Sequence, residues 1–278
     1  MAYAGQTAAT GALREEKEMG LLKGKVAIVS GIGPGLGRAT ALKLAEAGAN
    51  VVLAARTEAR LAEVADEVRA LGVQALAVPT DLAEPQDCEA LVEKSIAEFG
   101  RVDVLVNNAF MMPPFRRLDE YNVAKIQQSF EVNLFAPLRL SQAVIPHMRA
   151  AGEGSIVMIG SVILRKQTVN YGPYKVAKHA LLGLTRSLAA ENGPDGIRVN
   201  MVAPGYIGAA VVGLVAQMDA AARGIPEAQA RQSILDTLML RRAAEPEEIA
   251  DAILFFASGM SRSITAQCLD VTAGEFAH

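Results

Sequence analysis

VAIVSGIGPGLGRATALKLAEAG, residues 26–48, joins a strand-like run to a helical one through a glycine-rich turn. The pattern predicts a strand over 26–31 and a helix over roughly 35–47. Gly31, Gly35 and Gly37 form GxxxGxG between them. The first amides of a helix and the positive end of its dipole attract anions, and glycine lets the backbone approach a ligand closely. The turn therefore predicts a pyrophosphate site; the alternative is a glycine-rich turn without a ligand.

The same alternation of short β-branched runs and helical patterns continues along the chain. Alternating strands and helices imply crossover connections and a parallel sheet, and strands that are apolar on both sides need cover on both faces. We therefore expect one doubly wound, Rossmann-type α/β domain with a seven-stranded parallel sheet. Further strands are expected at 50–55, 73–80, 103–109, 155–161, 197–204 and 267–271, and further helices at 57–72, 85–99, 121–151, 173–191 and 246–257. Residues 206–245 read as irregular and partly helical, and residues 1–20 as a flexible extension.

Composition excludes several classes of function. The 278 residues include 27 basic and 30 acidic side chains, for a net charge of −3, without the basic excess of a nucleic-acid-binding protein. No apolar run reaches the length of a membrane span. Cys88 and Cys268 lie far apart without a CxxC or Cys/His cluster, which predicts no metal site and no disulfide. Free thiols fit a reducing compartment, so we expect a cytoplasmic protein.

The end of the second expected strand bears on the kind of nucleotide. In dinucleotide-binding folds an acid at this point binds the ribose 2′-hydroxyl of NAD, whereas a nearby arginine accepts the 2′-phosphate of NADP. The strand ends in Ala55 and is followed by Arg56. This favours NADP, and an NAD-binding protein with an apolar strand end is the alternative. The turn itself departs from the GxGxxG fingerprint, because Leu36 stands where the third glycine would be.

The stretch YGPYKVAK, residues 171–178, holds two tyrosine–lysine pairs at a spacing of one helical turn. Pro173 suits the first turn of a helix and disfavours a helical conformation at the residue before it. Tyr171 therefore precedes the helix, whereas Tyr174 and Lys178 both fall inside it. We expect the second pair to carry the chemistry and Tyr171 to form a wall of the substrate pocket.

Taken together, these motifs resemble the short-chain dehydrogenase/reductase family over residues 22 to 274. The resemblance is carried by the glycine turn, by Asn107-Asn108-Ala109, and by Asn133, Ser161, Tyr174-xxx-Lys178 and Pro204-Gly205. It implies a domain over 21–278 and a catalytic set of Ser161, Tyr174, Lys178 and Asn133. Cofactor contacts are implied at Gly31, Gly35, Leu36, Gly37, Arg56, Asp81, Leu82, Asn107, Ala109, Tyr174, Lys178, Pro204, Gly205 and Ile207.

The family resemblance implies hydride transfer between NAD(P) and a carbonyl or secondary alcohol. A tyrosine with its ordinary pKa near 10 is a poor base at neutral pH, so we expect the Lys178 ammonium and the oxidised nicotinamide to lower that pKa. Ser161 would hold the substrate oxygen, and Asn133 would anchor a water that relays protons from Lys178.

The substrate pocket is expected to be apolar, which predicts a small hydrophobic ketone or alcohol. The residues expected to line it are Phe110, Met111, Met112, Val162, Leu164, Tyr171, Tyr206 and Ile207. Residues 206–226 resemble the family's mobile substrate lid. Phe110 and Ala209 depart from the family pattern, where glycine and threonine are usual. By resemblance, the helices at 121–151 and 173–191 build a four-helix interface, which predicts a homodimer or, more often, a homotetramer.

Two other functions stay open on the sequence. One is a non-catalytic nucleotide-binding or regulatory protein on the same fold, against which the intact Ser161, Tyr174, Lys178 and Asn133 speak. The other is a dehydratase or epimerase that uses the fold without net oxidation of its cofactor.

Overall fold

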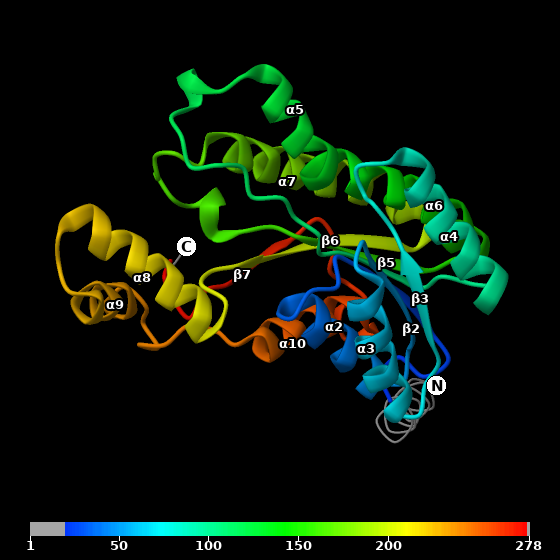
Figure 1. The fold of residues 1–278 in the computed structure, drawn as a ribbon. Helices are drawn as coiled ribbons and strands as arrows, with labels where there is room; N and C mark the ends of the chain where they lie inside the picture. The colour runs from blue at the N-terminus through cyan, green and yellow to red at the C-terminus, as the bar shows by residue number, and fades with distance from the viewer. Residues whose placement is uncertain (1–19, 277–278) are drawn as a thin grey trace, which may run out of the picture.

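The computed structural model describes residues 20–276, so the extension predicted at 1–20 lies, except for Gly20, outside the described residues. All seven strands pair in parallel in the order β3-β2-β1-β4-β5-β6-β7 (Figure 1). Their bounds are β1 Val26–Ser30, β2 Asn50–Ala55, β3 Ala75–Pro79, β4 Val104–Asn107, β5 Gly154–Ile159, β6 Ile197–Pro204 and β7 Cys268–Val271. Strands β2 and β3 are added on one side of β1, and β4 to β7 on the other side, so the strand order reverses between β1 and β4. In open α/β sheets, ligands bind at such a point.

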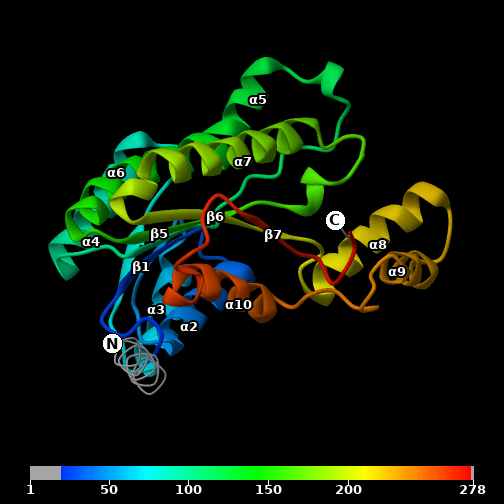
Figure 2. The same ribbon diagram turned by 180° about the vertical axis from the view of Figure 1, so that it is seen from behind.

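Helices cover both faces of the sheet (Figures 1 and 2). One face carries α2 (Leu36–Glu46), α3 (Glu58–Ala70) and α10 (Pro246–Ala257), and the other carries α4 (Pro85–Phe99), α6 (Ala136–Ala151) and α7 (Gly172–Asn192). Successive strand residues point to opposite faces, so in β1 Ile28 enters one core and Val29 the other. Both layers bury aliphatic side chains, which confirms the doubly wound fold.

Two predicted segments differ from the structure. The helix expected at 121–151 is α5 (Val123–Phe130), a π-helical turn η2 (Glu131–Phe135) and α6. Pro137 has no N–H, so it cannot make the α-helical bond to the carbonyl of Asn133, and the turn widens there.

The segment at 206–245 is more regular than expected. It forms α8 (Gly208–Arg223) and α9 (Glu227–Asp236), which pack on each other through a small cluster that includes Val212, Ala216 and Ile234. The small side chains of α8 gave only a weak helical periodicity in the sequence. No helix between residues 20 and 276 is long and apolar enough to cross a membrane.

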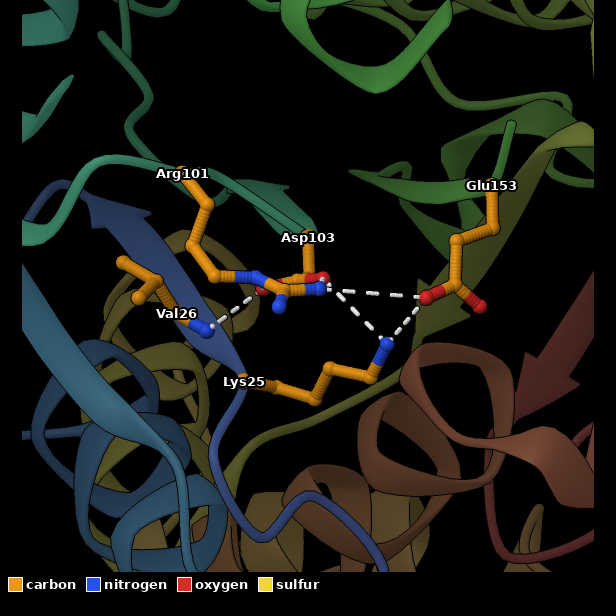
Figure 3. A network of polar contacts seen from close by, with 5 residues as sticks. All are labelled: Lys25, Val26, Arg101, Asp103 and Glu153. Carbon is orange, nitrogen blue, oxygen red and sulfur yellow. Dashed lines mark hydrogen bonds and ion pairs between the residues drawn. The ribbon is translucent and has the colours of Figure 1, made fainter. Parts of the chain in front are cut away.

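One buried carboxylate connects the amino ends of the central strands β1 and β4 (Figure 3). Asp103 is 6% exposed and accepts hydrogen bonds from the Val26 amide at 2.9 Å and from Arg101 Nε at 2.8 Å. Lys25 Nζ lies 3.3 Å from its other oxygen and also pairs with Glu153. These charges lie at the amino ends of the strands, where they stabilise the fold. The carboxyl ends of the strands are left for ligands.

Candidate active site

The glycine turn packs tightly against the end of β4. Gly31 has φ +81°, and a Cβ at this position would lie 2.5 Å from Ala109 Cα. A Cβ on Gly37 would lie 2.3 Å from the Gly31 carbonyl oxygen. No other residue fits these two positions, so the β1–α2 turn and the β4 end form one surface.

The residues around the start of α2 fit a dinucleotide phosphate group. Gly35 is the N-cap residue, without a side-chain cap, and neither Gly33 nor Gly35 has an atom near the place of a Cβ. The first helical bond runs from the Ala39 amide to the Gly35 carbonyl, so the amides before Ala39 are available to an anion. Leu36 is 8% exposed and its side chain lies in the core, so only its backbone can take part.

Two neighbours that were not among the expected cofactor contacts, Asn108 and Ser30, complete this surface. The Asn108 side chain donates to the Gly31 carbonyl at 2.8 Å, and Ser30 Oγ accepts from the Asn108 amide at 3.3 Å. Asn107 Oδ1 is buried without a hydrogen-bond partner among the described residues. The sequence signal for Asn108 was the pair Asn107-Asn108 at the end of β4, whereas nothing in the sequence pointed to Ser30.

The ends of β2 and β3 hold the residues expected at the adenosine end of a cofactor. Arg56 is exposed just past β2. Arg38, by contrast, donates to Glu67 through Nε at 2.9 Å and through a second, shorter bond, so its charge is already paired. Asp81 accepts from the Ala83 amide at 3.0 Å, which fixes the turn after β3, and the Leu82 side chain is buried. Their contacts with adenine stay a prediction.

Helix α7 separates the two tyrosine–lysine pairs. It begins at Gly172, so Tyr171 caps it while Tyr174 and Lys178 share one face inside it. Lys178 is 2% exposed, donates to the Ile159 carbonyl at 2.7 Å, and lies 5.6 Å from the centre of the Tyr174 ring. Lys175 points elsewhere, to the Lys166 carbonyl at 2.5 Å. The geometry thus joins the second pair and leaves the first apart.

Burial dominates the acid–base properties of this pair. It raises the pKa of Tyr174 to about 12, although a hydrogen bond with Ser161 acts in the opposite direction. Burial also lowers the pKa of Lys178 to about 7. In the protein without its cofactor, burial therefore outweighs the lowering expected from Lys178. The combined effect of Lys178 and the oxidised nicotinamide stays a prediction.

Ser161 stands at the end of β5 and caps η3 (Val162–Leu164), where its Oγ accepts from the Ile163 amide at 3.2 Å. It also acts to lower the pKa of Tyr174, so the two predicted catalytic hydroxyls lie near one another. The serine hydroxyl and the tyrosine phenol can therefore reach one substrate oxygen.

Asn133 is completely buried in the π-helical turn. Its side chain forms a paired interaction with Met111, accepting from the amide at 3.0 Å and donating to the carbonyl at 2.8 Å. It also donates to the carbonyl and hydroxyl oxygens of Ser129, both at 3.0 Å. Asn133 thus positions the loop that carries Phe110, Met111 and Met112, and its link to Lys178 through a water stays a prediction.

The expected pocket residues divide by exposure. Phe110 and Met112 are 61% and 40% exposed, whereas Val162 and Leu164 are buried. Tyr171 packs against Phe115, with ring centres 4.9 Å apart. Other expected contacts follow β6: Pro204 ends the strand, Gly205 and Tyr206 follow, and Ile207 caps α8. Their contacts with a ligand stay predictions.

Comparisons with known proteins find similar chains over nearly the whole length of this one. A family model described as enoyl-(acyl carrier protein) reductase matches residues 31–275. A short chain dehydrogenase/reductase of Aspergillus oryzae is 38% identical over 91% of this chain and 95% of its own. Cis-4-hydroxycyclohexanecarboxylate dehydrogenase of Sinomonas cyclohexanicum is 37% identical over 90% and 96%. Carveol dehydrogenase from Mycobacterium avium, solved with NAD, superposes with a TM-score of 0.86 at 31% identity, over 92% of this chain and 99% of its own.

The family model matches the chain from the glycine turn to beyond the last strand. The seven-stranded sheet, the open start of α2 and the joined Ser161, Tyr174 and Lys178 stand in one chain with relatives that match nearly its whole length. This chain belongs to the short-chain dehydrogenase/reductase family.

Proposed function

We propose that this chain transfers a hydride between NADP(H) and the carbon of a secondary alcohol or ketone in a small apolar substrate. The observation that carries the proposal is the buried Tyr174 phenol near the carboxyl ends of the strands. The Ser161 hydroxyl acts on this phenol, and Lys178 follows it by one helical turn. The relatives named above are dehydrogenases, which leaves the non-catalytic, dehydratase and epimerase alternatives without support.

The residues around the β1–α2 turn would hold the cofactor. The amides at the start of α2 would bind its pyrophosphate, and Arg56 would pair with a 2′-phosphate. When bound, the nicotinamide supplies or accepts the hydride. Arg56 would be the arginine that binds this phosphate, because Arg38 and Arg60, which line the pocket beside the turn, are already paired with Glu67 and Glu63.

Tyr174 would move the proton that balances the hydride. In reduction the phenol gives its proton to the substrate oxygen as the carbon gains hydride; in oxidation the phenolate takes that proton as hydride leaves. With a pKa of about 12 the phenol stays protonated at neutral pH, so the protein alone is prepared for reduction. Ser161 would donate to the same oxygen and stabilise its negative charge.

The apolar character of the substrate is inferred from the loop that Asn133 holds. Phe110 and Met112 leave large apolar surfaces exposed beside the site. A relative named for cis-4-hydroxycyclohexanecarboxylate, a cyclic secondary alcohol, supports an alicyclic substrate. Residues 206–226 would serve as the lid, since α8 exposes Val211, Leu214 and Met218.

The assembly and the compartment are part of the same proposal. Apolar side chains stay exposed on α5, η2 and α7, at Val123, Phe135 and Val176, which supports a homotetramer built through these helices. Cys88 and Cys268 are free thiols, which supports a cytoplasmic location.

A matched pair of variants tests the function. Purified protein would be screened with cyclic ketones and secondary alcohols and with NAD(H) and NADP(H), followed at the absorbance of the reduced nicotinamide. Tyr174→Phe should lower kcat by at least about a hundredfold, because general acid–base catalysis contributes roughly 10²–10⁴-fold. Tyr171→Phe should stay within about fivefold of wild type. Turnover by Tyr174→Phe close to the wild-type rate would refute the mechanism.

A further inference from the structure

Two consecutive basic residues after η3 pair with acids at the far end of the chain. Arg165 Nε lies 3.0 Å from Asp270 on β7, and Lys166 Nζ lies 2.5 Å from Glu275 Oε1 in the turn that follows β7. The segment between β5 and α7, which borders the predicted substrate pocket, is therefore tied to the C-terminal part of the described chain.

The Lys166–Glu275 pair lies beside the site rather than on the outer surface. The two side chains are 17% and 7% exposed. Lys166 Nζ also donates to Tyr206 Oη at 3.3 Å and lies 4.4 Å from the centre of that ring. Glu275 Oε2 would lie 3.4 Å from a Cβ on Gly205, directly past the end of β6.

The pair is also electrostatically connected with the tyrosines of the site. Burial raises the pKa of Tyr171, the neighbouring Tyr206 raises it further, and Lys166 lowers it. Tyr171 in turn acts on Tyr174. The geometric link is Lys175, the residue after Tyr174, which donates to the Lys166 carbonyl at 2.5 Å.

One oxygen of the pair has no partner. Glu275 Oε2 is buried and receives no hydrogen bond from the residues that the structure describes. A buried acceptor without a donor is unfavourable, and a ligand that brings a donor removes that penalty. The Lys166 side chain is 17% exposed, so it is the more accessible side of the pair for a ligand.

We propose that Lys166 and Glu275 form a polar subsite for a hydroxyl group of the substrate, remote from the carbon that is oxidised or reduced. The ligand oxygen accepts from Lys166 while its proton is donated to Glu275 Oε2. A hydroxyl matches because it is both donor and acceptor; a carboxylate would be repelled by Glu275 and an ammonium by Lys166. The inference rests on the proposed function and narrows its substrates to hydroxylated cyclic alcohols and ketones.

Equilibrium binding tests the subsite without turnover. Cyclohexanone, decalone and their hydroxylated derivatives would be titrated by calorimetry into Tyr174→Phe saturated with NADPH. At least one hydroxylated ketone should bind about tenfold or more tightly than its parent, as expected for a hydrogen bond to a charged group. Glu275→Gln and Lys166→Met, each added to Tyr174→Phe, should reduce this preference to less than about threefold. Equal binding of every hydroxylated ketone and its parent would refute the subsite.

Asp270→Asn is the matched control, because it weakens the neighbouring ion pair of the same segment without touching the subsite. Loss of the preference in this variant would mean that the pairs only tether the segment, and would overturn the proposal. The proposal would also be overturned if Glu275→Gln bound NADPH more weakly and still preferred hydroxylated ketones over their parents. Oε2 would then bind the cofactor rather than the substrate. Failure of wild-type protein to turn over any ketone would count against the proposed function, while the binding ratio still decides the subsite.

Discussion

Replacing Asn133 by aspartate exchanges one NH₂ group for an oxygen atom in a completely buried site. In the wild-type protein that NH₂ group donates to the carbonyl oxygens of Met111 at 2.8 Å and Ser129 at 3.0 Å. In Asn133→Asp an oxygen would face both carbonyls. The Ser129 hydroxyl can turn and donate to the new oxygen, but neither carbonyl can, so the carboxylate must be repelled or take up a proton.

Protonation sets the upper limit of the cost. An aspartate in the unfolded chain has a pKa of about 3.9, so protonating it at pH 7 costs about 4.2 kcal/mol at roughly 1.36 kcal/mol per unit. The buried site raises the folded-state pKa above that value, so stability is retained at low pH and lost as the pH rises toward the folded-state pKa. Asn133→Asp should lose about 4 kcal/mol of unfolding free energy at pH 7, and about 1.5 kcal/mol at pH 5.

Urea unfolding of wild type and variant between pH 5 and 8, followed by circular dichroism, measures this difference. The matched control is Asn200→Asp, since Asn200 is equally buried, donates to the Ile264 carbonyl at 2.9 Å and accepts from the Gln267 amide at 3.0 Å. Both variants should lose similar stability. At a pH where both are folded, only Asn133→Asp should lose activity, by about tenfold or more, because the loop at Met111 is no longer held.

A loss below about 1 kcal/mol at pH 7, or a loss independent of pH, would mean that the Asn133 amide does not make the bonds described. Equal loss of activity in Asn200→Asp would reduce Asn133 to a general contributor to stability.

Three further predictions concern other parts of the molecule. Arg56→Asp should lower the ratio of NADP to NAD efficiency by about tenfold or more, measured from kcat/KM with each cofactor, and an unchanged ratio would exclude Arg56 as the reader of the phosphate. Alcohol oxidation needs deprotonated Tyr174, whose pKa burial raises to about 12, so kcat/KM for oxidation should rise with pH from 6 to 9 while that for reduction does not; a flat oxidation profile would contradict this assignment. Asp103→Ala leaves the buried Val26 amide without an acceptor, whereas Lys25 and Arg101, the cationic partners of Asp103, stay partly hydrated. Urea unfolding should therefore show a loss of about 2–3 kcal/mol of unfolding free energy, without a change in KM.

Much of the fold and of the site followed from local patterns in the sequence. The glycine spacing at 31–37, the strand periodicities and the proline before Tyr174 are effects of neighbouring residues on one another, so they act before any tertiary contact exists. The helices at 85–99 and 246–257 and the strands at 50–55 and 197–204 accordingly have the predicted bounds. Local rules failed where small residues weakened the helical signal, as in α8, and where Pro137 opened a π-helical turn.

The tertiary structure decided how the site residues are used. The direction of the Lys178 ammonium depends on the Ile159 carbonyl, the role of the Asn133 side chain on Met111, and the charge beside the pocket on the pairing of Lys166 with Glu275. Each of these contacts joins residues from different elements, and side-chain spacing along the chain carries no information about which carbonyl or carboxylate another element brings near. Burial is likewise a property of the packed layers, which is why the sequence alone identified Tyr174 but did not predict that burial raises its pKa in the protein without cofactor.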